Sequence, residues 1–139
     1  MTDVYHEHAH RVTYAETDRM GFVYYANYLV WFEIGRTEYI RETGLAYAEL
    51  EDMGFCLPVI EATCRYERPA KYDDVITIRT RVSEFKGIRL GFEYEVIRDG
   101  LTLARGTTMH AFMDKEGRPR KLPKDIRERL VRSIKREEI

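Results

Sequence analysis

Residues 27–43 place the strongest constraint on the fold, because their pattern predicts a helix that does not lie on a surface. The stretch contains no proline and ends at Gly44, a residue type favoured just past a helix C-terminus. Gly35 in its middle costs about 1 kcal/mol relative to alanine, which close packing against another backbone would explain. The apolar residues cover more than one narrow stripe: Tyr28, Leu29, Trp31, Phe32, Ile34, Tyr39 and Ile40. We therefore expect one long helix that is buried on most sides.

From residue 57 onward the apolar pattern changes to a period of two, which is typical of strands. Asp99 and Gly100 give a strong hairpin signal between two of these segments. The expected strands cover residues 6–14, 57–69, 75–85, 90–96 and 101–113. One long buried helix beside about five strands indicates the α+β class, with residues 1–139 in a single domain.

Two shorter helices complete the expected order of elements. The first covers residues 46–53 and is stopped by Gly54. The second is a terminal helix over about residues 123–137, with Pro123 in its first turn. Its narrow apolar stripe consists of Ile126, Leu130, Val131 and Ile134.

The charge balance of the chain excludes several classes of partner. The 23 Lys and Arg residues nearly cancel the 24 Asp and Glu residues, and a net charge of −1 gives no case for binding nucleic acid or an anionic membrane. No apolar run approaches the roughly 20 residues that span a bilayer, and the N-terminus lacks the regions of a signal peptide. Cys56 and Cys64, expected on one strand about 26 Å apart, are too distant for a disulfide. Reduced thiols indicate a cytoplasmic protein.

Histidines on the first strand raise the alternative of a metal site. His6, His8 and His10 share one face at a spacing of about 7 Å, which is too wide for ligands of one metal without distortion. We therefore expect an exposed or interface strand and no metal. His110, alone on the last strand, favours a structural role.

Residues 14–28 join the first strand to the buried helix and form the most unusual segment of the chain. Asp18 lies a few residues before the helix N-terminus, whose backbone N–H groups and dipole can hold a developing negative charge. A carboxylate beside such amides is the minimum set for attack on an acyl carbonyl. The alternative is that Asp18 only caps the turn of residues 17–21, since Asp is common in turns. The spacing alone leaves both interpretations open.

The same segment resembles the signature of the 4-hydroxybenzoyl-CoA thioesterase family of hotdog-fold acyl-CoA thioesterases. Within that family, it is most similar to the branch associated with the bacterial Tol–Pal cluster. The matching positions are Tyr14, Thr17, Asp18, Gly21, Val23, Tyr24, Tyr25, Asn27 and Tyr28. The resemblance implies a hotdog fold, in which a curved antiparallel sheet wraps around one long central helix. Such a sheet fits the broad apolar coat of residues 27–43.

By this resemblance, Asp18 is the catalytic carboxylate and either attacks the thioester carbonyl or activates a water. The backbone N–H of Tyr25 polarises the carbonyl oxygen, and Tyr14 lies at the substrate. Many members of the Tol–Pal-associated branch have a histidine in place of Tyr25, and a tyrosine, with a usual pKa of about 10, is a poor base. The reaction implied needs no metal or organic cofactor, because CoA is part of the acyl-CoA substrate.

Coenzyme A carries phosphates, so a CoA thioesterase needs basic groups near its pocket. Lys86 and Arg89, between two expected strands, are the candidates, and a solvated hairpin is an equal alternative. The sequence has neither of the glycine motifs that bind nucleoside triphosphates or dinucleotides. The resemblance further implies a homodimer or homotetramer with its active sites at the subunit interface.

Three alternative functions or mechanisms follow from the same residues. Glu33 or Glu38 could act as a base, as a helix glutamate does in another hotdog lineage, although ion pairs with nearby arginines explain them better. A hotdog hydratase would need a histidine five residues after Asp18, where this chain has Val23. From a different class, a non-catalytic module that binds acyl-CoA or acyl carrier protein would share the fold.

Overall fold

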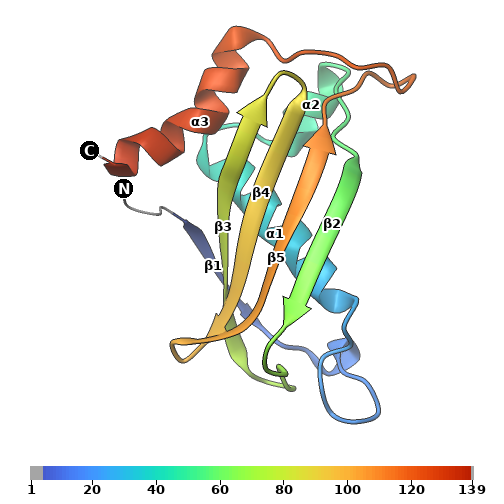
Figure 1. Cartoon of the computed structure of the whole chain (residues 1–139), viewed down its shortest axis with the longest axis vertical. Helices are drawn as coiled ribbons and strands as arrows, with labels where there is room; N and C mark the ends of the chain where they lie inside the picture. The colour runs from blue at the N-terminus through green and yellow to red at the C-terminus, as the bar shows by residue number, and fades with distance from the viewer. Residues whose placement is uncertain (1–4, 139) are drawn as a thin grey trace.

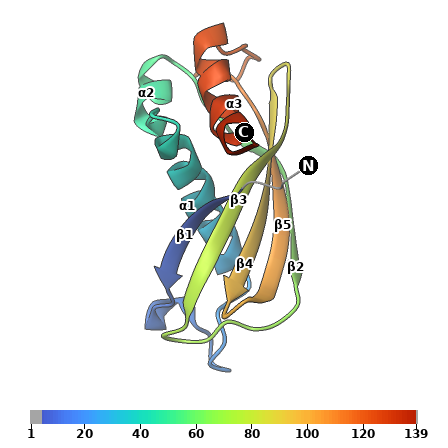
Figure 2. The ribbon, with the colours of Figure 1, turned by 90° about the vertical axis from the view of Figure 1, so that its left-hand side faces the viewer.

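Five antiparallel strands form one sheet, and a long helix lies across one of its faces (Figure 1). In the computed structural model, which describes residues 5–138, the strands are β1 (His6–Arg11), β2 (Val59–Tyr66), β3 (Val75–Lys86), β4 (Arg89–Arg98) and β5 (Leu101–Ala111), and the helices are α1 (Asn27–Glu42), α2 (Tyr47–Asp52) and α3 (Lys124–Glu138). The strand order across the sheet is β1-β3-β4-β5-β2. The side view shows α1 along one face of the curved sheet and α3 near one end (Figure 2). The predicted α+β class is confirmed.

Two glycines let α1 and the sheet approach closely. A Cβ atom at Gly35 would lie 2.3 Å from Thr80 Oγ1 and 2.8 Å from Ile78 Cγ2, both on β3. A Cβ atom at Gly106 on β5 would lie 2.3 Å from the ring of Phe32. Because interiors are close-packed, a larger residue at either position would push the helix away from the sheet. Gly35 is closely packed as predicted, but against side chains of β3 rather than against another backbone.

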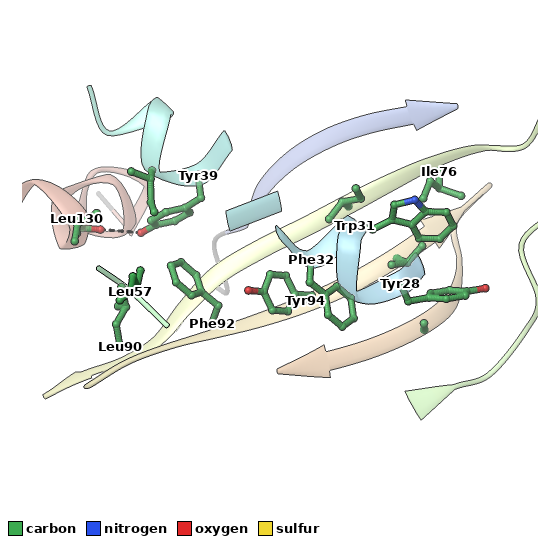
Figure 3. Close-up of a cluster of buried hydrophobic side chains, with 14 of the residues drawn as sticks. Tyr28, Trp31, Phe32, Tyr39, Leu57, Ile76, Leu90, Phe92, Tyr94 and Leu130 are labelled. Carbon is green, nitrogen blue, oxygen red and sulfur yellow. Dashed lines mark hydrogen bonds between the residues drawn. The ribbon is translucent and has the colours of Figure 1, made fainter. Parts of the chain in front are cut away.

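The core between α1 and the sheet is rich in aromatic rings (Figure 3). Trp31 and Phe32 are fully buried, and the Phe32 ring stacks on Tyr94 with 4.3 Å between the ring centroids. On another side of the helix, Leu29 and Val30 are 42% and 49% exposed. The expectation that Leu29 is buried is therefore wrong, because the sheet does not cover its side of the helix.

The two outer edges of the sheet differ in how they are covered. β1 pairs only with the part of β3 between Val75 and Thr80. Beyond it, the Arg127 guanidinium of α3 donates hydrogen bonds to the carbonyls of Phe85 and Gly87, each at 3.0 Å. At the opposite edge, β2 exposes nearly all of its eight residues. The structure therefore leaves a long edge open at β2.

A chain of hydrogen bonds crosses the core from β4 to the segment before β2. Thr108 Oγ1 lies 2.6 Å from the Tyr94 hydroxyl and 2.8 Å from His110 Nε2. His110 Nδ1 lies 3.2 Å from the Leu57 carbonyl oxygen, which can only accept, so Nδ1 carries the proton. Burial, together with the nearby charge of Arg36, lowers the pKa of His110 to about 4. This neutral, buried histidine agrees with the structural role expected of it.

Several strand boundaries differ from the sequence expectations, most clearly at the end of β1 and at both ends of β2, which covers Val59–Tyr66 rather than residues 57–69. The first strand ends at Arg11 rather than at residue 14, because the chain turns there into the short 3-10 helix η1 (Tyr14–Glu16). β2 begins after Pro58, which has no N–H to donate to the ladder. Cys56 therefore lies before the strand that contains Cys64, and placing both on one strand was wrong; both thiols are free.

The histidine face of β1 turns toward α1. His6 Nδ1 lies 3.0 Å from a carboxylate oxygen of Glu42, and the His10 ring lies 5.8 Å from the Trp31 ring. This face is therefore half-buried against the helix rather than exposed. Within residues 5–138, no group of three or more His, Cys, Asp or Glu side chains is placed to hold a metal ion.

The terminal helix packs through its apolar stripe. Ile126 and Leu130 are buried as predicted, whereas the side chain of Ile134 lies outside the described part of the chain. A hydrogen bond also joins this helix to α1: the Tyr39 hydroxyl donates to the Leu130 carbonyl at 2.9 Å (Figure 3). Of the described helices, none combines the length and apolarity needed to cross a bilayer.

Candidate active site

The Asp18 side chain caps a tight turn in the loop between β1 and α1. Its Oδ1 atom accepts hydrogen bonds from the backbone N–H groups of Met20 (2.8 Å) and Phe22 (3.2 Å). Gly21, with φ of +83°, supplies the left-handed residue that the turn needs. The capping interpretation is thus confirmed for one carboxylate oxygen. Within the described chain, no hydrogen bond reaches the second oxygen, Oδ2.

The N-terminus of α1 offers backbone donors close to this turn. The first helical hydrogen bonds are donated by Asn27 to Tyr24 O (2.9 Å) and by Tyr28 to Tyr25 O (3.3 Å). Among the described residues, the N–H groups of Tyr25 and Ala26 have no acceptor. They therefore remain available, at the positive end of the helix dipole, to an oxygen that gains negative charge.

Asp18 and Tyr25 line the same pocket, which has a volume of about 400 Å³. The other lining residues come from the Asp18 loop, from α1 and from the end of β2: Met20, Phe22, Val23, Tyr28, Tyr66, Glu67, Arg68 and Pro69. Most of this wall is aromatic or apolar, with polar groups at a few points. Such a lining is typical of a site for a small molecule whose reacting group must be oriented.

Tyr66 connects the end of β2 to the helix N-terminus. Its hydroxyl donates to the Tyr25 carbonyl at 2.9 Å, and its ring packs edge-on to Tyr28 with 5.0 Å between centroids. Burial, then a hydrogen bond with Cys64, raises the pKa of Tyr66, so the hydroxyl stays protonated and keeps its donor. Tyr66 thereby supports the turn from which the Tyr25 N–H projects.

Of the other predicted site residues, Tyr14 does not line the pocket. Its ring is 77% exposed and meets the Tyr72 ring at 5.7 Å. Lys86 and Arg89 lie opposite each other in the strand register, at the exposed β3–β4 hairpin. Figure 1 places this hairpin at the opposite end of the sheet from the loop that holds Asp18. Within one protomer, the structure therefore does not bring Lys86 and Arg89 to the pocket.

Sequence reasoning missed Tyr66 and Arg68 as pocket residues. They reach the site because Val23 N–H bonds to the Ala70 carbonyl at 2.8 Å, which draws the chain after β2 against the Asp18 loop. No local sequence pattern predicts a contact between residues more than forty positions apart. Glu33 is exposed and outside the pocket lining, as expected of a residue without a role in it.

Comparison with known proteins decides the family. A family model described as the thioesterase-like superfamily matches residues 12–130, most of the chain, including the whole Asp18 loop and α1. The chain belongs to this superfamily. The hotdog fold and the resemblance to hotdog thioesterases are thereby confirmed, whereas the Tol–Pal-associated branch stays a prediction.

Individual superfamily members are similar to this one over nearly their full lengths. The acyl-CoA thioesterase YbgC of Haemophilus influenzae is 36% identical over 119 residues, covering 84% of this chain and 88% of its own. The acyl-CoA thioester hydrolase YbgC of Escherichia coli is 30% identical over 118 residues, with 84% and 88% coverage. The crystal structure of a DHNA-CoA thioesterase from Staphylococcus aureus superimposes with a TM-score of 0.89 at 28% identity, covering 97% and 95% of the two chains.

Proposed function

We propose that this superfamily member hydrolyses acyl-CoA thioesters to a carboxylic acid and free CoA. One observation carries the proposal: Asp18 and Tyr25 line one pocket, and among the described residues neither the second oxygen of the Asp18 carboxylate nor the helix N-terminal amide of Tyr25 has a hydrogen-bond partner. The names of the similar proteins support a thioester as the substrate. CoA enters the reaction only as part of the substrate.

The proposed mechanism uses the Tyr25 amide to bind the thioester carbonyl oxygen. Asp18 removes a proton from a water as the water oxygen adds to the carbonyl carbon. The oxygen that becomes negative is then held by the Tyr25 N–H, and loss of such a donor typically costs about 10²- to 10³-fold in rate. The C–S bond breaks next, and the departing CoA sulfur takes up the proton from Asp18. In the alternative route, Asp18 attacks the carbonyl carbon directly, expels the CoA thiolate and forms an anhydride that water hydrolyses.

A homodimer, or a tetramer of two such dimers, would bring the remaining predicted residues to the pocket. The open β2 edge, with Val59 and Ile60 45% and 49% exposed, offers a surface for a second copy. Antiparallel pairing of two β2 strands reverses one protomer end to end. The β3–β4 hairpin of the partner, with its Lys86 and Arg89, then lies at the same end as this protomer's pocket and faces CoA phosphates, with Tyr14 at the entrance. We further propose a cytoplasmic location, consistent with the free thiols.

Release of free thiol from a panel of acyl-CoAs tests the function, with Asp18→Asn as the decisive variant. Asn keeps the turn-capping oxygen but removes the base, so we expect a loss of about 10²- to 10⁴-fold in kcat/KM. Asp114→Asn is the matched control, because Asp114 Oδ1 caps its own turn through the N–H groups of Glu116 and Arg118, both at 2.9 Å, outside the pocket. Its activity should equal that of the wild type.

Two outcomes contradict the proposal. If the wild type releases no thiol from any acyl-CoA yet binds CoA, the chain is a binding module. If thiol is released but Asp18→Asn and Asp114→Asn behave alike, the reaction does not use Asp18. Light scattering of the purified protein tests the assembly separately, since a monomeric mass contradicts the interface at β2.

A further inference from the structure

The Glu16 carboxylate receives hydrogen bonds from three different parts of the chain. Trp31 of α1 donates its indole N–H to Oε2 at 2.7 Å. His10 of β1 lies 3.0 Å from Oε1 and 3.1 Å from Oε2 through its Nε2 atom. Thr13 donates both its backbone N–H (2.8 Å) and its hydroxyl (3.1 Å) to Oε1. Strand, helix and loop therefore meet at one side chain that is 18% exposed.

The backbone of Glu16 makes a second set of contacts, on the far side of the Asp18 turn. Its carbonyl accepts the Tyr24 N–H at 2.9 Å and the side-chain amide of Asn27 at 2.8 Å. Tyr24 directly precedes Tyr25, and Asn27 is the first residue of α1. The same residue thus holds both ends of the segment that contains the two groups proposed to act on the substrate.

We propose that Glu16 is a positioning residue, which fixes the Asp18 carboxylate relative to the Tyr25 N–H. This inference rests on the proposed thioesterase function. Glu16 does not line the pocket, so it acts through the loop and not on the substrate. Both groups must meet one carbonyl at the same time, and a misplacement of about 1 Å from such a remote change can cost about 10²-fold in rate.

The chemistry of the contacts explains why a carboxylate is required. All the groups that face it donate, and an ionised carboxylate offers only acceptor sites, on two oxygens. Glutamine has the same length but would turn an NH₂ group toward one of these donors, and aspartate would be too short by one methylene. Although burial raises the pKa of Glu16, the hydrogen bonds from Thr13, His10 and Trp31 outweigh it and hold that pKa below its usual value.

Glu16→Gln tests the inference, with Glu49→Gln as a matched control. Glu49 also accepts a backbone N–H three residues before it, from Ala46 at 3.3 Å, but it caps α2 and lies outside the pocket. We expect Glu16→Gln to lower kcat about 10- to 100-fold with KM within about twofold. Glu49→Gln should leave both constants unchanged. A kcat within twofold of wild type in folded Glu16→Gln overturns the inference, even where Asp18→Asn is inactive.

Hydrogen exchange gives a readout that does not depend on turnover. We expect faster exchange of the backbone amides of residues 17–25 in Glu16→Gln than in wild type, and no change there in Glu49→Gln. If the wild type releases no thiol, the proposed function fails, and unchanged exchange in these residues would separately overturn the role of Glu16. Should Glu16→Gln not fold, Asn27→Ala removes one donor to the Glu16 carbonyl and keeps the carboxylate. Its kcat should fall several-fold, and an unchanged kcat overturns the inference.

Discussion

Two polar networks lie between helix α1 and the strands, and they differ in charge and in exposure. At the N-terminal end of the helix, the ionised Glu16 joins β1, the helix and the Asp18 loop through charged hydrogen bonds, and it remains partly exposed. In the core, the neutral chain of Tyr94, Thr108 and His110 is wholly buried. The first network holds a loop near solvent, whereas the second fills the interior of the sheet.

The difference shows where the protein tolerates a charged side chain. A buried ion without complete solvation by hydrogen bonds is costly, and His110 therefore stays neutral beside the half-buried Arg36, whose positive charge also lies next to Tyr94. A charged acceptor makes stronger hydrogen bonds than a neutral one, which suits a loop that packing alone does not hold. We therefore expect damage to the core network to reduce stability, and damage to the Glu16 network to reduce turnover.

The largest expected effect follows from removing the centre of the core network. His110→Ala creates a cavity and leaves the Leu57 carbonyl and the Thr108 hydroxyl without this partner. We expect the free energy of unfolding to fall by about 3–4 kcal/mol, while kcat per folded molecule stays near that of wild type. Urea unfolding and thiol release measure the two quantities. A variant of normal stability with reduced kcat would reverse the comparison.

The two networks should also lose their contributions to stability at different pH values. The unfolded chain protonates His110 near its usual pKa of 6.5, but the folded protein does so only near pH 4, so stability is complete above pH 6.5 and falls as the pH drops toward 4. The loss is at most about 3 kcal/mol. Glu16, with a lowered pKa, keeps its contribution above the usual value of 4.5 and loses it only at more acidic pH.

Urea unfolding at a series of pH values from 7.5 to 3.5, in wild type and in His110→Gln, isolates the first of these effects. The difference between the two proteins should shrink as the pH falls from 6.5 to 4, because only the wild type has a histidine to protonate at this position. A difference that is constant across this range would show that His110 has the same pKa in both states.

A smaller effect distinguishes the two ends of α1. Trp31→Phe removes the indole donor to Glu16, and Tyr39→Phe removes the hydroxyl donor to the Leu130 carbonyl. We expect the free energy of unfolding to fall by about 2 kcal/mol in the first variant, where the acceptor is charged, and by about 1 kcal/mol in the second. Only Trp31→Phe should also lower kcat several-fold. Equal kcat values in the two variants would count against a separate role for the site end of the helix.

The sequence predicted the secondary-structure elements better than the tertiary contacts between them. The helix, the hairpin at Asp99 and Gly100 and the period-two strands follow from local patterns, and all are present. Asp18 and Tyr25 could be proposed together from the sequence because both lie in one continuous motif. Tyr66 joins the pocket only through a bond across the fold, and Lys86 lies at an end of the sheet that its local pattern does not specify.

The unequal edges of the sheet also bear on how far assembly can proceed. Fibril growth needs two receptive edges in each copy, so that every added molecule offers a new one. Here Arg127 already occupies the Phe85 and Gly87 carbonyls on the β3 side, and β1 is a six-residue strand of charged residues and histidines around one alanine. Two copies joined through β2 would each use up their long open edge. In the proposed assembly, growth by strand addition would end at the pair, which would also protect the protein against amyloid-like stacking.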